Sequence, residues 1–116
     1  AGVHMASKRA SAALDLAEAE RVKQLLKREH RLLLQEAKHE LEVCETQLTL
    51  SKSHFDIASE NLRLSQKSFD LGESNLLDFL KIQEQFFLSK GNYTTKIIEC
   101  KRAIAQHNQI KGVLLP

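Results

Sequence analysis

The stretch SFDLGESNLLDFL, Ser68 to Leu80, interrupts a chain that otherwise has the pattern of continuous helix. Gly72 suits the left-handed residue that often follows a helix, because a side chain disfavours that conformation. Asn75 is a preferred helix N-cap, and Asp78 places a negative charge near the exposed N–H groups of a first helical turn. The stretch therefore predicts a turn at 71–74 that joins two helices.

Outside this turn the chain is poor in residues that end helices. It has 116 residues with Gly 4, Pro 1 and Trp 0, and Leu, Ala, Glu, Lys and Gln are abundant. We predict an all-α fold, a long antiparallel helical hairpin with a first helix over about 7–71 and a return helix over about 75–111. Gly112 and Pro116 are the stop signals. The hairpin is assigned to 6–116, because residues 1–5, AGVHM, resemble a cloning-vector remnant.

Apolar residues recur every seven positions along the first arm. One series alternates large and small residues, as in a coiled-coil seam: Leu41, Leu48, Phe55, Leu62 and Phe69 with Cys44, Ser51, Ala58 and Ser65. A second series lies about 130° from the centre of that seam: Val43, Leu50, Ile57, Leu64 and Leu71. Two apolar edges predict a neighbour on each side, as in the wall of a helical barrel, with an ordinary bundle core as the alternative.

The return arm carries two similar series, less regularly spaced. They are Leu76, Phe79, Phe86, Tyr93, Ile97, Cys100 and Ile104, and Leu77, Leu80, Phe87, Thr94, Ile98 and Ala105. Cys44 and Cys100 are equidistant from Gly72 and should face each other in the seam. We expect two buried, reduced thiols, with a disulfide as the alternative, because packed helix axes lie about 8–10 Å apart. Residues 7–32 have no partner in the hairpin, which predicts self-association.

The turn and its flanks resemble a known family. Phe69, Gly72, Asn75, Leu77, Asp78, Leu80 and Gln83, followed by a helix ending in AIAQHNQIKGVLLP, are similar to the second helical hairpin of the outer membrane efflux proteins, the TolC family. The resemblance covers nearly all of 7–116, including the long first helix and the shorter return helix. It implies a periplasmic tunnel segment, a fragment of a helical barrel, from a trimeric efflux or secretion duct at the outer membrane of a Gram-negative bacterium.

The resemblance also implies partners and a site. In that family the membrane is crossed by a β-barrel, which this stretch does not hold, and the hairpin turns meet a periplasmic adaptor linked to an inner-membrane pump. The candidate adaptor-binding residues are Phe69, Leu71, Gly72, Glu73, Ser74, Asn75, Leu76 and Leu77. Exposed leucines there would give an adaptor apolar surface to bury. Asp78 and Lys81 are candidates for the tunnel constriction, although many members have a second acidic residue at the position of Lys81.

Two other functions stay open from the sequence. The chain could be the hairpin of the adaptor itself, or a structural coiled coil without a transport role. We expect no enzyme, because clustered Ser, His and Asp, a phosphate loop and convergent carboxylates are missing. His39, Cys44, Cys100 and His107 fall at similar heights but not on one face, so we expect neither a metal nor a cofactor. With Lys+Arg 17 and Asp+Glu 15 mixed along the chain, no nucleic-acid surface is predicted.

Overall fold

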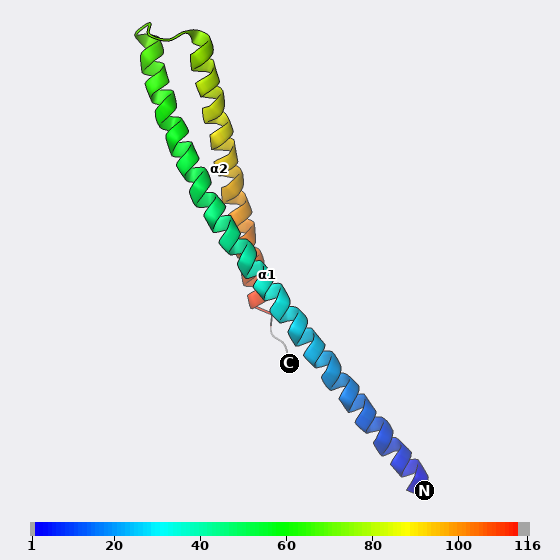
Figure 1. Ribbon diagram of the computed structural model, residues 1–116. Coiled ribbons are helices and arrows are strands. Elements are labelled where there is room, and N and C mark those ends of the chain that lie inside the picture. The colour runs from blue at the N-terminus through cyan, green and yellow to red at the C-terminus, as the bar shows by residue number, and fades with distance from the viewer. Residues whose placement is uncertain (1, 114–116) are drawn as a thin grey trace.

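The computed structural model describes residues 2–113 and consists of two helices joined by a short turn (Figure 1). Helix α1 spans Gly2–Asp70 and helix α2 spans Leu76–Lys111. The described residues contain no strand, so the predicted all-α hairpin is confirmed. Helix α1 begins at Gly2 rather than near residue 7. Ala1 of the suspected vector remnant and Pro116, the expected stop signal, lie outside the described residues.

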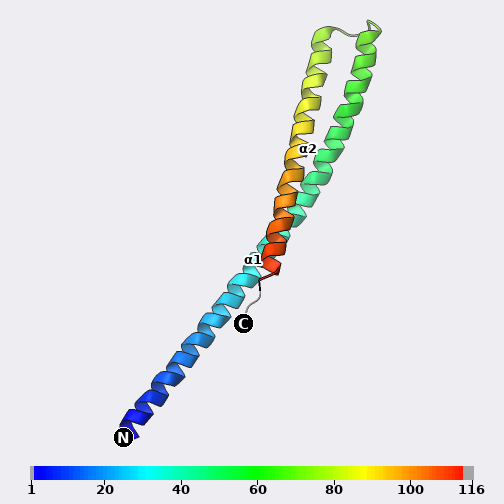
Figure 2. The ribbon, with the colours of Figure 1, turned by 180° about the vertical axis from the view of Figure 1, so that it is seen from behind.

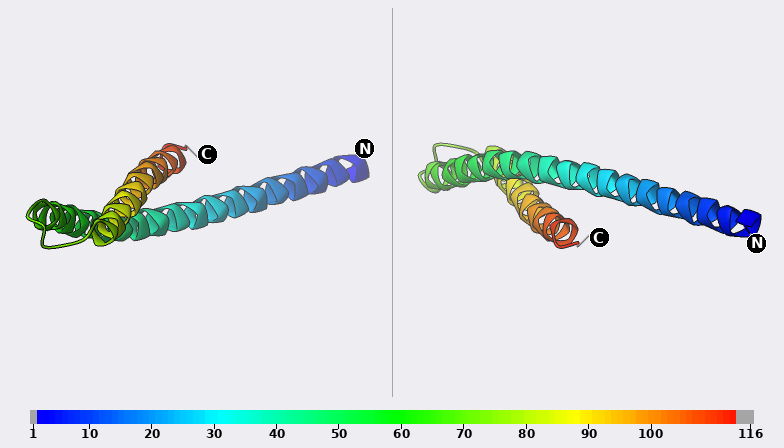
Figure 3. Two further views of the ribbon diagram at one scale, coloured as in Figure 1. Left: turned by 90° about the horizontal axis from the view of Figure 1, so that it is seen from above. Right: turned by 90° about the horizontal axis from the view of Figure 1, so that it is seen from below.

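The two helices make a thin rod with extents of 105 × 18 × 14 Å. They run antiparallel, and the N-terminal part of α1 projects well beyond the end of α2 (Figure 2). Seen from above and from below, α2 crosses α1 at an angle (Figure 3). Such winding is expected of a seam with a seven-residue repeat, because an α-helix has 3.6 residues per turn and a straight pair would drift out of contact.

Small side chains form the most buried line of the seam. The buried residues of α1 are Ala37, Cys44, Ser51, Ala58 and Ser65. The large residues between them are half-buried, because they cover the sides of the contact. Phe55 packs against Phe86 and Tyr93, with ring centroids 5.6 and 5.7 Å apart. The predicted seam of α1 is therefore confirmed, and Ala37 extends it by one repeat.

The seam of α2 differs in part from the predicted series. Phe79 and Cys100 are buried and Phe86 and Tyr93 are half-buried, as expected for residues that face α1. Leu76 and Ile104 were wrongly assigned to this series, because both are exposed. Six half-buried residues at the seam spacing were missed: Ile82, Ser89, Lys96, Ala103, His107 and Ile110. The leucine and isoleucine were misleading because α2 is apolar on more than one side.

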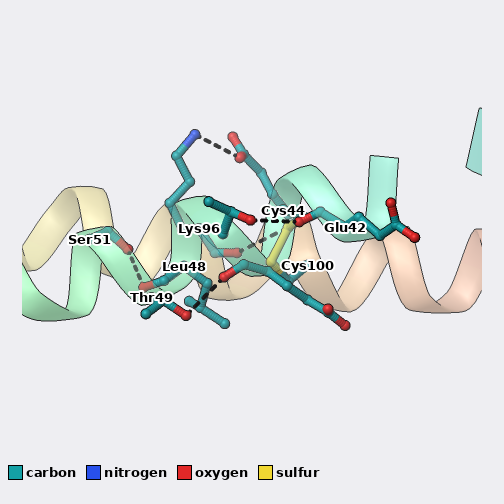
Figure 4. The surroundings of a disulfide bond; sticks show 10 residues. Glu42, Cys44, Leu48, Thr49, Ser51, Lys96 and Cys100 are labelled. Atoms are coloured by element: carbon teal, nitrogen blue, oxygen red, sulfur yellow. Dashed lines mark hydrogen bonds and ion pairs between the residues drawn. A yellow bond between two sulfur atoms is a disulfide. The ribbon is translucent and has the colours of Figure 1, made fainter. Parts of the chain in front are cut away.

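Cys44 and Cys100 are joined by a disulfide bond across the seam (Figure 4). The predicted register is confirmed, whereas the expectation of two reduced thiols is wrong. Their Cα atoms lie 5.5 Å apart. A Cα atom lies about 2.3 Å from its helix axis, so facing Cα atoms are closer than their axes by up to about 4.6 Å. Helix axes about 10 Å apart therefore still allow a disulfide between facing positions.

Replacing both cysteines by alanine should lower the free energy of unfolding by about 4 kcal/mol, the chain-entropy value for a cross-link with a sequence separation of 56. Urea unfolding followed by circular dichroism measures the difference. Ser51→Ala is the control, because it changes a buried seam residue and keeps the bridge. Equal stability of the double variant and the parent would contradict the stabilising role of the disulfide.

The contact between the helices ends near His30. Its Nε2 atom lies 2.8 Å from the carbonyl oxygen of Ile110, in the last turn of α2. Residues 2–29, called the overhang below, extend past this point without cover from α2. Large apolar residues of the overhang are exposed: Leu14, Leu16, Val22, Leu25 and Leu26. Leu32 and Leu33, just after His30, are exposed as well. The predicted unpartnered segment is therefore confirmed. No described helix is long and apolar enough to cross a membrane.

Candidate functional site: the hairpin tip

The end of α1 is closed by backbone hydrogen bonds around Gly72. The N–H of Gly72 donates to the carbonyl of Phe69 at 3.0 Å, and the N–H of Glu73 donates to the carbonyl of Ser68 at 2.9 Å. This pair of bonds is the Schellman motif, which pairs carbonyls that a helix end leaves free. Gly72 has a φ of 73°, so its predicted left-handed conformation is confirmed.

The start of α2 is capped by Asn75, as predicted. Its side-chain oxygen accepts a hydrogen bond of 2.9 Å from the N–H of Asp78. The carboxylate of Asp78 lies in the first turn of α2, where it interacts favourably with the positive end of the helix dipole. Residues of the turn itself thus form hydrogen bonds with free backbone groups at both helix ends. These bonds fix the path of the chain between the helices.

A stacked aromatic pair lies between the two helices next to the turn. The rings of Phe69 on α1 and Phe79 on α2 lie 5.4 Å apart and are inclined by 18°. Phe79 is buried and Phe69 half-buried. Phe69 therefore closes the seam beneath the tip. Phe79 was not among the expected tip residues, although its position four residues after the cap, on the seam side, was a usable signal.

The apolar residues expected at the tip are exposed. Leu71, Leu76 and Leu77 are 64%, 55% and 61% exposed. Glu73 is exposed beside them. Isolated exposed leucines are ordinary on protein surfaces, but three within seven residues of a rigid turn form a small apolar patch with an acidic edge. The structure brings these predicted residues together.

Near the tip, Ser68, Ser74 and Asp78 lie at an open hollow between the helices. The hollow is lined by Asn61, Leu64, Ser65, Ser68, Ser74, Asp78 and Ile82. The hydroxyl oxygen of Ser74 is buried and has no hydrogen-bond partner among the described residues. Lys81 is exposed and is absent from the hollow. The two candidate constriction residues, Asp78 and Lys81, thus face different surroundings.

Fixed charges contribute little at the tip. The ion pairs of the described residues all join side chains three apart on the same helix. The closest to the tip is Glu60 with Arg63, whose hydrogen bond lowers the pKa of the Glu60 carboxyl and raises the pKa of Arg63. Both side chains are solvated, and such pairs add little stability. The tip is therefore shaped by backbone geometry and apolar packing.

Comparisons with protein-family models, with curated proteins and with solved structures find no match for this chain. The site is therefore assessed from its own residues.

Gly72→Ala should destabilise the hairpin by about 1–2 kcal/mol, because the left-handed conformation is strained for a residue with a Cβ atom. Nothing lies within 4 Å of that added atom, so the effect is conformational. Gly91→Ala is a matched control with the opposite sign. Gly91 is also open, but it lies within α2, where alanine should stabilise by about 0.5–1 kcal/mol. Thermal unfolding of both variants tests the pair, and the same sign for both would contradict the assigned turn.

Proposed function

We propose that this chain is a tunnel segment of an outer-membrane efflux or secretion duct, and that its tip docks a periplasmic adaptor of a tripartite export pump. The resemblance of the turn sequence to the TolC family motivates the proposal. The observation that carries it is the tip, where three exposed leucines surround a turn whose backbone is held by its own hydrogen bonds.

The tip has the properties of a docking surface. A partner that buries Leu71, Leu76 and Leu77 gains hydrophobic stabilisation. Because the Schellman motif and the Asn75 cap already order the backbone, little conformational entropy is lost on binding. Glu73 and the polar hollow beside Ser74 supply hydrogen-bonding groups at the rim, where interfaces are commonly polar.

The sides of the hairpin support a tunnel wall. Val43, Leu50, Ile57 and Leu64 are all exposed along α1, and Leu80, Phe87 and Ile98 are exposed along α2. Each helix therefore has an apolar surface outside the seam, which a neighbouring helix would cover in a closed wall. A trimer of full-length chains, each supplying such hairpins, would bury both sets. In that duct Asp78 and Lys81 are the proposed residues near the constriction.

Leu76→Asp and Leu77→Asp should each weaken binding to the cognate adaptor about tenfold to a hundredfold, the effect of losing one buried leucine. Surface plasmon resonance against purified periplasmic adaptors of the source bacterium measures this. In cells the same changes in the full-length duct should reduce efflux and leave trimer formation intact. Gly72→Trp is less informative, because the φ of 73° strains any side chain at that position.

Leu88→Asp is the matched control. Leu88 lies on the same helix, is 67% exposed and is remote from the turn, so its substitution should leave adaptor binding unchanged. If every adaptor fails to bind the parent chain, the structural coiled coil without a transport role becomes the better interpretation. An equal loss in Leu88→Asp would show that binding does not use the tip.

A further inference from the structure

Outside the seam, helix α1 and the start of the turn carry a row of apolar residues that face solvent. This outer row consists of Val43, Leu50, Ile57, Leu64 and Leu71, all exposed. We propose that a second copy of this chain covers the row, in an antiparallel dimer in which the overhang of each copy lies along the outer row of the other. The proposal does not depend on the adaptor interaction, and it is an alternative to the tunnel wall proposed above, in which a neighbouring helix covers the same row.

A groove follows the outer row along one side of the hairpin. Its hollows share Gln47, His54 and Asn61, so they adjoin one another. One wall is the outer row from Val43 to Leu64, and the other wall comes from α2: Asp78, Gln85, Asn92 and Glu99. Both walls repeat every seven residues. A groove with this period on both sides is shaped to receive another helix.

The heptad position next to the outer row is polar along the hairpin and apolar upstream, where α2 has ended. Along the hairpin this neighbouring position is polar, with Gln47, His54, Asn61 and Ser68. Upstream, the same heptad position holds four apolar residues, called the upstream row: Ala12, Ala19, Leu26 and Leu33. All four are exposed. A helix without packing is only marginally stable in water, so an apolar row in this part of α1 indicates a partner.

The side from which the partner approaches follows from the seam. Continued upstream of His30, the seam positions are Lys27, Lys23 and Glu20, followed by Leu16 and Ala13. A second helix in the place that α2 occupies lower down would therefore first meet three charged residues. The upstream row lies on the groove side of α1, so a single partner helix on that side can cover both the overhang and the outer row.

In an antiparallel pair of chains, each residue of the upstream row of one copy can face a residue of the outer row of the other copy. With Leu26 opposite Ile57 of the second copy, the same register places Leu33 opposite Leu50. It also places Ala19 opposite Leu64 and Ala12 opposite Leu71. Because both rows repeat every seven residues, all four pairs form together, and a two-fold axis lets each copy give and receive the same contacts. The assembly therefore closes as a dimer instead of growing into a filament.

Charges give this register little support. It places Lys23 and Lys27 at the heights of residues 84 and 88 on α2 of the second copy, whereas Asp78, which lines that wall of the groove, comes level with Ala17. Glu40 continues the upstream row and comes opposite Val43, so its carboxylate weakens the centre of the interface. Replacing Glu40 by an apolar residue should therefore tighten the dimer.

Sedimentation equilibrium of the disulfide-bonded chain tests the assembly, and we expect a concentration-dependent dimer. Leu26→Glu should raise the dimer dissociation constant about a hundredfold, because the symmetry places two substituted leucines in the interface. Leu25→Glu, on the neighbouring exposed position outside the row, should have little effect. Glu40→Leu should lower the dissociation constant about tenfold, and Glu45→Leu, on the opposite side of α1, should not.

Cross-linking fixes the register. Leu26→Cys and Ile57→Cys chains, mixed under mild oxidation, should give a disulfide-linked heterodimer, whereas Leu26→Cys mixed with Asp56→Cys should not. Circular dichroism of each variant excludes loss of helix as the cause. A parent chain that stays monomeric at its highest soluble concentration, a trimer, equal cross-linking in both mixtures, or equal weakening by Leu25→Glu and Leu26→Glu would each overturn the proposal.

Discussion

The line of small residues along the seam is the constraint on which the rest of the hairpin depends. Ala37, Cys44, Ser51, Ala58 and Ser65 let the backbones of α1 and α2 approach closely, and the larger residues then cover the sides of the contact. Close approach places facing Cα atoms at 5.5 Å where the cysteines meet, within the range that a disulfide requires. The bridge in turn fixes the register, and the register determines which residues remain exposed for other partners.

The hairpin and its turn could be predicted because their signals are local. A left-handed glycine and an asparagine cap specify helix ends by short-range sterics and hydrogen bonds, and the seven-residue repeat of α1 is nearly unbroken. The seam of α2 was harder to predict. Lys96 is half-buried there, because its aliphatic stem packs while its ammonium reaches Glu99 at 3.0 Å. Ser89 and Ala103 carry too little hydrophobicity to stand out, whereas exposed Leu76 and Ile104 carry more.

The position of the exposed leucines at the tip could be predicted, but the packing beneath them could not. The turn sequence was enough to group Leu71, Leu76 and Leu77 at one end of the rod. The stack of Phe69 on Phe79 and the burial of the Ser74 hydroxyl depend on how the two helices and the chain path meet, which no local pattern encodes. The disulfide was misjudged because the distance between the helix axes was compared with the Cα separation that a disulfide allows. Facing Cα atoms lie closer together than the axes of their helices.

The hydrogen bonds of the turn make the tip a self-contained unit. The carbonyls that accept from Leu71, Gly72 and Glu73 belong to the last turn of α1, and the Asn75 side chain satisfies the first turn of α2. Little of this arrangement involves the distant parts of either helix. The segment from Lys67 to Phe79 can therefore be transplanted onto another antiparallel coiled coil of matching seam, and its surface studied apart from the rod that normally carries it.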